Sequence, residues 1–337
     1  MREEIIISGR MNHGVDPILH AWGWEIAIYL FLGGLAAGLL VYAAYNSLFN
    51  KEKNFFITNK VAPMFVPIFL SLGLMALFID LHHKLFFWRL YTTIHLNSPM
   101  SWGAWTLMAV TPLSIIYAVL NLKTVFPNIN YTIKQLQPLK WILIETKNGE
   151  SNWDWKFKWT LNLEKFFNKN IKTILWALLI LGIILGIYTG ILLSAFNARP
   201  LWNTSILGIL FLVSGLSTAA AFIMLISNDK DEIAWFSKID LTLIGIELFL
   251  IIHIFMGYLA STQVQIDAAE MFLGGKYTVP FWGFVVFIGL LLPALLEILE
   301  MRGFHINPKF AAFLVLFGGL VLRFVIIYAG QSSRYLY

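Results

Sequence analysis

The chain has 337 residues, of which 58% are hydrophobic and only 13% are charged, and its formal net charge is +5. A soluble domain carries about 25% charged residues, so this composition excludes an ordinary soluble protein and predicts an integral membrane protein. The sequence contains no cysteine, which excludes disulfides, thiolate metal sites, iron–sulfur ligation and a cysteine nucleophile within this chain. The mixed, polar residues 1–20 lack the basic and then apolar pattern of a cleaved signal peptide.

Long apolar runs predict the secondary structure. A helix that crosses the hydrocarbon core needs about 20 apolar residues, and eight stretches meet this requirement. In chain order they are residues 22–48, 61–82, 102–125, 171–196, 204–227, 239–261, 280–300 and 309–331. The predicted fold class is therefore all-α: a polytopic membrane protein with eight transmembrane helices, forming a single domain over residues 1–337.

One connection, residues 126–170, is much longer than the others. It contains ESNWDWKFKWTLNLEKFF, in which Trp and Lys interleave as they do at a headgroup boundary. We interpret it as an interfacial loop, with a docking surface for a partner as the alternative. Lys and Arg are more numerous in the loops after the first, third, fifth and seventh spans, an imbalance that depends on this loop. Because cytoplasmic loops are enriched in these residues, we place the loop in the cytoplasm and both termini outside, in the inner (cytoplasmic) membrane.

Polar side chains gather where five predicted spans reach the outer side of the membrane. Polar residues inside a span are costly and are therefore candidates for function. Glu25 and Tyr29 are four residues apart and share one face of the first helix. The other members are Trp22, Trp24, Asp80, His82, His83, Lys84, Trp102 within residues 97–105, Tyr188, Asn197 and Arg199 in the corner 197–203, Arg323, Tyr328 and Gln331. An aromatic belt explains the Trp residues but not the charged ones at one level, so a shared pocket is favoured over a belt alone.

A second set of ionisable residues lies in the inner half of the sixth and seventh spans. Its members are Asp240, Glu247, Glu297 and Glu300. Asp240 and Glu247 are seven residues apart and so lie on one helix face, two turns from each other. Glu247 falls in mid-span, where an unpaired charge costs about 3 kcal/mol or more. Ser214, Ser217 and Thr218 on the fifth span form a polar patch that could hydrogen-bond to it. The set predicts either a structural contact between helices or a proton relay.

The remaining residues restrict the chemistry. Only His253, of seven histidines, lies well inside a predicted span, so a bis-histidine haem is not expected. No phosphate-binding glycine loop, catalytic triad or zinc spacing occurs. If this protein moves electrons, it must bind a diffusible carrier and pass the electrons to another subunit. A quinone suits such a site, with an apolar slot for its tail and a Tyr, His or carboxylate at each carbonyl.

Four segments resemble the NrfD/PsrC family of quinone-interacting membrane subunits. They are IAIYLFLGGLAAGLL on the first predicted helix, SPMSWGAW at the start of the third, YTGILLSAFNARPLWNTSILGILFLVSGLSTAAA across the fourth and fifth, and LVLFGGLVLRFVIIYAGQ on the last. The resemblance covers nearly the whole chain in the same order, and the run PLWNT…LFLVSGLSTA is its most specific part.

The resemblance implies an eight-helix protein built from two four-helix bundles that carries no haem, iron–sulfur cluster or metal of its own. It implies that the outer face docks on a four-cluster iron–sulfur subunit, which connects to a molybdopterin catalytic subunit. Menaquinol or a related quinol is expected to bind near that face. Tyr188 matches the quinol-binding tyrosine of the family. The first helix departs from the pattern, because Tyr29 stands where the family has a histidine and Glu25 or Ile26 occupies the neighbouring turn.

The sequence therefore predicts a membrane subunit of a respiratory oxidoreductase, which is not catalytic alone. It would exchange electrons and protons between the (mena)quinone pool and the iron–sulfur partner, with Tyr188, Tyr29 and Glu25 as the reacting side chains. The predicted quinone pocket further contains Asp80, His83, Trp102, Asn197, Arg199 and Arg323, and the candidate proton path contains Asp240, Glu247, Glu297 and Glu300. The alternatives are a proton-conducting or transport module and a passive anchor, both without quinone chemistry.

Overall fold

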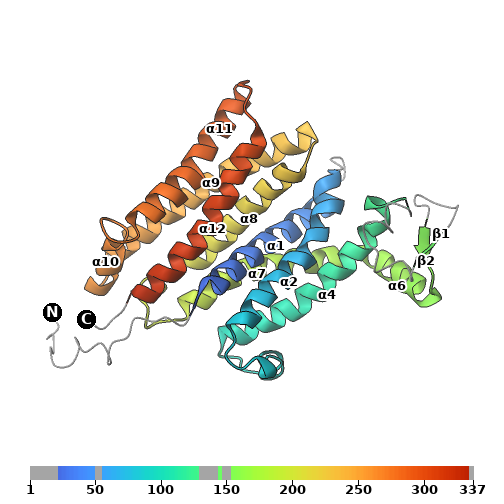
Figure 1. The fold of residues 1–337 in the computed structure, drawn as a ribbon, viewed down its shortest axis with the longest axis horizontal. Helices are drawn as coiled ribbons and strands as arrows, with labels where there is room; N and C mark the ends of the chain where they lie inside the picture. The colour runs from blue at the N-terminus through green and yellow to red at the C-terminus, as the bar shows by residue number, and fades with distance from the viewer. Residues whose placement is uncertain (1–21, 50–54, 129–142, 146–152, 334–337) are drawn as a thin grey trace.

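A computed structural model describes residues 22–49, 55–128, 143–145 and 153–333, and these are almost entirely helical (Figure 1). Within them, eight helices are long and apolar enough to cross a membrane, which confirms the predicted fold class. In chain order they are α1 (Trp24–Phe49), a π-helical turn (Ile57–Val61) continued by α2 (Ala62–Asp80), α4 (Pro99–Val125), α7 (Ile171–Ser194), α8 (Ile206–Ile226), α9 (Lys230–Leu259), a π-helix (Val279–Leu291) continued by α11 (Leu292–Met301), and α12 (Pro308–Ser332). The predictions made for residues 1–20 and for the middle of the long loop lie outside the described residues.

The helices α9 and α4 begin several residues earlier than the hydrophobic runs predict, and each early start has a local reason. The α9 helix starts at Lys230, well before residue 239, because the Asp229 side chain caps it by accepting a hydrogen bond of 3.0 Å from the backbone N–H of Asp231. Acidic residues in its first turn add a favourable interaction with the helix dipole. The α4 helix starts at Pro99, since proline fits the first helical position without losing a hydrogen bond.

The long helices lie side by side with their axes roughly aligned (Figure 1). Helix α1 packs against α2 and α7, and α4 packs against the same two helices. Helix α8 packs against α9 and α12, and α12 also contacts the π-helix 279–291 and α11. Contacts of α8 with α1 and α7 join the two groups. The division into two four-helix bundles stays a prediction of the resemblance.

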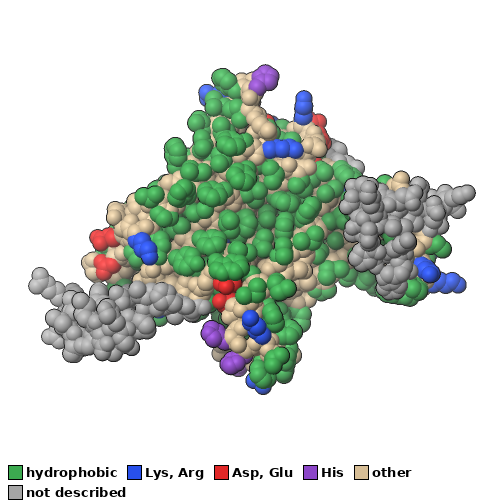
Figure 2. Space-filling model, in the orientation of Figure 1, with side chains coloured by type: hydrophobic (Ala, Val, Ile, Leu, Met, Phe, Trp, Pro, Cys, Tyr) green, Lys and Arg blue, Asp and Glu red, His purple; other side chains and the backbone are tan. Residues whose placement is uncertain are grey.

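The surface agrees with a bilayer as the solvent for the middle of the molecule. Hydrophobic side chains cover the centre of the face in Figure 2, and charged side chains lie towards its ends. Large apolar residues such as Phe249, Phe287 and Ile180 are more than half exposed on the spans.

Because successive spans run in opposite directions, α1 begins and α12 ends at the same end of the helices, which we call the terminal face. The short elements η2 (Lys84–Phe86) and α3 (Arg89–Thr92) follow α2 there, and α10 (Gln263–Glu270) follows α9. The opposite face carries the long connection. Its described parts form two antiparallel strands, β1 (Leu143–Glu145) and β2 (Trp153–Trp155), and the helix α6 (Lys158–Lys169), so part of the expected loop is regular structure.

Candidate functional site

Two buried tyrosines lie together near the terminal face. Tyr29 comes from α1 and Tyr188 from α7, and only 5% and 7% of their surfaces are exposed. Their side chains are close enough to interact electrostatically. The direct packing of α1 on α7 creates this proximity between residues that are far apart in the sequence. Both tyrosines are among the reacting side chains that the sequence predicts.

Helix α4 reaches this pair through Gly103. The ring of Tyr188 packs so closely on Gly103 that a Cβ at this position would overlap the phenol carbon and the hydroxyl oxygen. The neighbouring Trp102, which the sequence predicts to line the quinone pocket, is exposed. Its indole N–H donates to the Leu96 carbonyl oxygen at 2.9 Å. Gly103 is not recognisable as a site residue from the sequence, because a glycine carries no polar group that would mark it.

The hydroxyl groups of Tyr29 and Tyr188 form no hydrogen bond with any residue in the described part of the chain. Other buried tyrosines are paired: Tyr117 donates to the Asn59 carbonyl oxygen at 3.0 Å, and Tyr258 donates to that of Leu201. Neither oxygen is among the fully enclosed side-chain atoms that lack a partner, so both hydroxyls reach accessible space between the helices. A ligand with hydrogen-bonding oxygens would be able to contact them there.

Two half-buried carboxylates lie nearer to the terminal face than the tyrosine pair. Glu25 is one helical turn before Tyr29 on α1, and Asp80 is the last residue of α2. The two carboxylates interact electrostatically, and Asp80 also interacts with His82. Groups of this kind accept and release protons. They lie between the tyrosine level and the end of the helices.

A third tyrosine, Tyr91, borders this group on the segment between α2 and α4. It is half-buried, burial raises its pKa above the ordinary value of 10.0, and it interacts electrostatically with Tyr29. Tyr91 lines a cavity of about 290 Å³ between α2 and the segment. The cavity is otherwise lined mainly by apolar side chains, including Leu74, Phe78, Phe87 and Leu90. Tyr91 is not recognisable as a site residue from the sequence, because a tyrosine in a loop belongs to no periodic pattern.

Two further residues of the predicted pocket, His83 and Asn197, are exposed at the terminal face. Arg199 in the corner 197–203 donates through Nη1 to the carbonyl oxygens of Gln331 and Ser333, at 3.0 and 2.9 Å. These carbonyls belong to the C-terminal end of α12, where a cation is stabilising. The guanidinium thus fastens the corner to α12.

Trp202 completes this attachment. It is fully buried, its indole N–H donates to the Ile326 carbonyl oxygen at 2.8 Å, and its ring lies where a side chain at Gly330 would stand. Its ring also packs on Trp22, at 5.2 Å between centroids. The aromatic and polar character of the corner therefore reflects its packing on α12 and on the start of α1.

The structure places Arg323 inside the helices and away from the corner. Its Nη1 donates to Ser214 Oγ at 2.8 Å, and its Nη2 donates to the Phe211 carbonyl oxygen at 3.2 Å. The guanidinium also stacks on the Phe211 ring, with 4.4 Å between its carbon and the ring centroid. Glu247 of α9 interacts with it electrostatically. Arg323 thus belongs with the carboxylates that the sequence assigned to the inner half.

These carboxylates form a buried series between α8, α9 and α11. Asp240 accepts a hydrogen bond of 2.6 Å from Ser217 and interacts electrostatically with both Glu247 and Glu297. Glu297 in turn interacts with Glu300 near the end of α11. Asp240 Oδ2 and both carboxylate oxygens of Glu297 accept no hydrogen bond from an N–H or hydroxyl group of the described residues, and the two carboxyl groups share a side-chain hydrogen bond with each other. In the serine patch, Ser217 contacts Asp240, and Ser214 contacts both Arg323 and Glu247, the residue for which the sequence predicts this partner.

The described residues contain no group of three His, Asp or Glu side chains that could hold a metal ion.

The eight apolar helices and the lipid-facing surface define a multi-pass membrane protein with ionisable groups buried between its spans. Residues 13–333 match the family model described as Polysulphide reductase, NrfD. Because this match covers nearly the whole chain, the protein belongs to the NrfD family.

Three relatives illustrate the range of this similarity. The protein is 29% identical to one chain of the polysulfide reductase of Wolinella succinogenes, over 92% of its own length and 94% of that relative. It is 30% identical to NrfD of Escherichia coli over 93% and 95% of the two proteins. It is 24% identical to one subunit of the selenate reductase of Mesobacillus selenatarsenatis, over 96% of its own length and 77% of that relative.

Proposed function

We propose that this protein is the membrane subunit of a respiratory oxidoreductase and exchanges electrons and protons between the quinone pool and a partner subunit. The single observation that carries the proposal is the pair Tyr29 and Tyr188, buried side by side with hydroxyls that have no protein partner among the described residues. A quinone has two carbonyl oxygens, and a quinol two hydroxyls. Either form is able to hydrogen-bond to the tyrosines.

The surroundings of the pair suit such a substrate. The apolar cavity that Tyr91 lines has the character needed for part of an isoprenoid tail, and Tyr91 interacts electrostatically with Tyr29. Glu25 and Asp80 would take the protons released when a quinol is oxidised and pass them to water at the terminal face. The electrons would pass to a partner subunit, in keeping with the relatives that are named as parts of reductases.

The terminal face is our candidate for contact with an iron–sulfur subunit, which would connect to a molybdopterin-type catalytic subunit. Two relatives are named as parts of polysulfide and selenate reductases, and this supports the presence of catalytic partners. The segment between α2 and α4 also exposes Leu85, Ile94 and Leu96, which are 86%, 70% and 65% accessible. Apolar residues that are exposed together at the end of a membrane protein mark a contact surface. The distribution of Lys and Arg supports an outer location for this face.

The buried carboxylates support a second part of the proposed function, which is proton transfer. Glu300, Glu297 and Asp240 lie in series from the opposite face towards the middle of the helices, and Glu247 and Arg323 continue the series. Oxygens of Glu297 and Asp240 that accept no hydrogen bond from an N–H or hydroxyl group of the described residues leave room for water or a shared proton. We propose that this series carries protons from the cytoplasmic side, which would make quinol turnover electrogenic.

The test compares Tyr188→Phe and Tyr29→Phe with the unchanged complex in quinol oxidation. Each substitution removes one hydroxyl and keeps the ring, so turnover should fall by about tenfold or more while assembly is unaffected. Tyr45→Phe is the matched control, because Tyr45 is half-exposed on the same helix as Tyr29 but near its other end.

Difference spectra with quinone analogues separate this function from a transporter or an anchor. Binding should shift the analogue spectrum in the unchanged protein and weaken in both tyrosine variants. Unchanged turnover in Tyr188→Phe would remove this residue from the site. If no spectral shift occurs with all subunits present, the proposed quinone site is wrong, and a transporter or an anchor remains as the function.

A further inference from the structure

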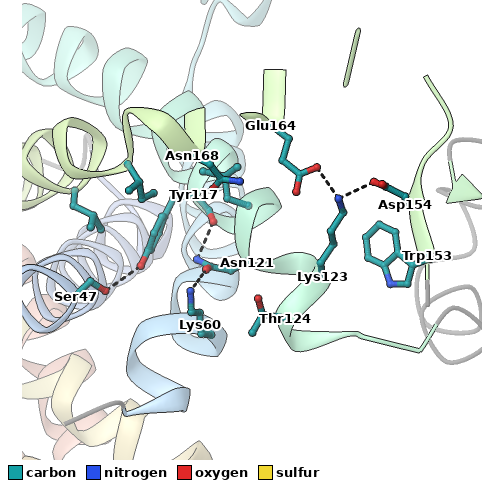
Figure 3. Close-up of a pocket in the computed structure, with 13 residues that line it drawn as sticks. Ser47, Lys60, Tyr117, Asn121, Lys123, Thr124, Trp153, Asp154, Glu164 and Asn168 are labelled. Carbon is teal, nitrogen blue, oxygen red and sulfur yellow. Dashed lines mark hydrogen bonds and ion pairs between the residues drawn. The ribbon is translucent and has the colours of Figure 1, made fainter. Parts of the chain in front are cut away.

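We propose that the protein binds one phosphatidylethanolamine molecule at the opposite face, with the headgroup in a polar cavity and an acyl chain along α4. The polar cavity has a volume of about 470 Å³ and lies between α1, α4, β2 and α6 (Figure 3). This site is separate from the tyrosine pair and does not depend on the proposed quinone chemistry.

The cavity walls carry a hydrogen-bonded polar lining at the depth of lipid headgroups. Tyr117 of α4 shares a hydrogen bond of 3.3 Å with Ser47, and Lys60 donates to Asn121 at 2.9 Å (Figure 3). Thr124 and Asn168 also line the cavity and add donors for a phosphate. The lining stands at the ends of α1 and α4, where spans leave the hydrocarbon.

Among the described residues that line the cavity, the charged side chains are two cations and two carboxylates. Lys123 forms ion pairs of 2.7 Å with both Asp154 and Glu164, and Lys60 supplies the second cation (Figure 3). Two cations and two carboxylates fit a zwitterion better than an anion. Each carboxylate has a second oxygen, which accepts no hydrogen bond from a described residue and is available to a primary ammonium. A phosphate and a nearby ammonium on one headgroup are what phosphatidylethanolamine presents.

An apolar groove of about 450 Å³ adjoins the cavity, since Leu120 and Glu164 contribute to both walls. On one side it is lined by Ile115 and Val119 of α4, which lie within the span, and on the other by Trp159 and Leu163 of α6. A chain in this groove would run from the headgroup level into the bilayer.

Helix α6 has the form of an interfacial helix. Its exposed Trp159, Leu163 and Phe166 form one stripe, and Lys158, Lys165 and Lys169 form another, about a quarter turn away. Such helices lie in the interface plane with aromatic residues in the acyl boundary and lysines in water. Only Asn170 separates α6 from the span α7, which holds it at this depth.

The experiment is native mass spectrometry of the full-length protein, purified together with its partner subunits. Before the measurement, the sample is exchanged into mixtures of phosphatidylethanolamine, phosphatidylcholine and phosphatidylglycerol. One phosphatidylethanolamine should be retained, about tenfold more tightly than phosphatidylcholine, which lacks the N–H donors. Glu164→Gln should reduce this preference. Val119→Trp should fill the groove and lower retention about tenfold, whereas Ile180→Trp, on the lipid-facing side of α7, should not.

Thermal unfolding and size exclusion establish that each variant is folded. Should Glu164→Gln fail to fold because Lys123 loses a partner, Val119→Trp still tests the site away from the ion pairs. Equal retention of the three lipids, a preference for phosphatidylglycerol, or full retention by Val119→Trp would overturn the proposal.

Discussion

Ser217 donates a hydrogen bond of 2.6 Å to one carboxylate oxygen of Asp240, while the second oxygen accepts none from an N–H or hydroxyl group of the described residues. Asp240 also shares a side-chain hydrogen bond with Glu297, the next member of the series. A hydrogen bond between two carboxyl groups requires a proton on one of them. A proton held between two carboxyl groups in this way is suited to proton exchange.

Glu297→Gln should abolish charge separation without stopping quinol oxidation. The amide keeps the shape of the side chain but carries no exchangeable carboxyl proton. In vesicles containing the complete complex, the membrane potential per quinol should fall about tenfold or more. A voltage-sensitive dye measures it, and Glu270→Gln, exposed in α10, is the control. An unchanged potential in Glu297→Gln would assign this series a structural role.

Gly103→Ala should lower quinol turnover by displacing Tyr188. A methyl group at this position meets the phenol ring, which has to shift or push α4 away from α7. Overpacking of this kind costs typically about 1–3 kcal/mol, so the melting temperature should also fall. Gly245→Ala on α9 is the control, because no atom lies within 4 Å of a Cβ built there. If both variants retain normal turnover, the close packing of Tyr188 is not needed for activity.

Arg323→Leu should destabilise the protein by about 3–5 kcal/mol, because it leaves the buried Glu247 without its positive neighbour. The double substitution with Glu247→Leu should recover a large part of this loss, since it removes both charges together. Denaturation in detergent measures the free energy of unfolding of the three variants and the unchanged protein. Additive effects of the two substitutions would mean that the residues are not coupled.

Glu232→Ala should loosen the opposite face. This fully buried carboxylate accepts hydrogen bonds from the backbone N–H and the hydroxyl of Thr58, at 2.8 and 2.6 Å, and from Ser227 at 2.8 Å. Its loss leaves these donors unpaired and should cost about 3 kcal/mol, seen as a lower melting temperature. Asp231→Ala, at the exposed neighbouring position, should change stability by no more than about 0.5 kcal/mol. Equal melting temperatures for Glu232→Ala and Asp231→Ala would contradict this account.

Apolar runs are enough to establish that the chain crosses a membrane, how many spans it has and the approximate depth of most polar residues, although they place Arg323 too near the outer end. These properties follow from the length of each run and from position along a helix. Residues at one depth, such as Tyr29 and Tyr188, are therefore recognisable as possible neighbours from the sequence. Helix ends that depend on local capping, as at Asp229, are predicted less well.

Tertiary packing alone selects which residues at the same depth face one another. Arg323 and Arg199 both belong to the predicted outer group, yet one bonds to Ser214 between helices and the other to the end of α12. Gly103 enters the site solely because the Tyr188 ring lies on it. The direction in which a side chain points around its helix depends on which helices pack together, and apolar spans without a marked polar face do not encode it locally.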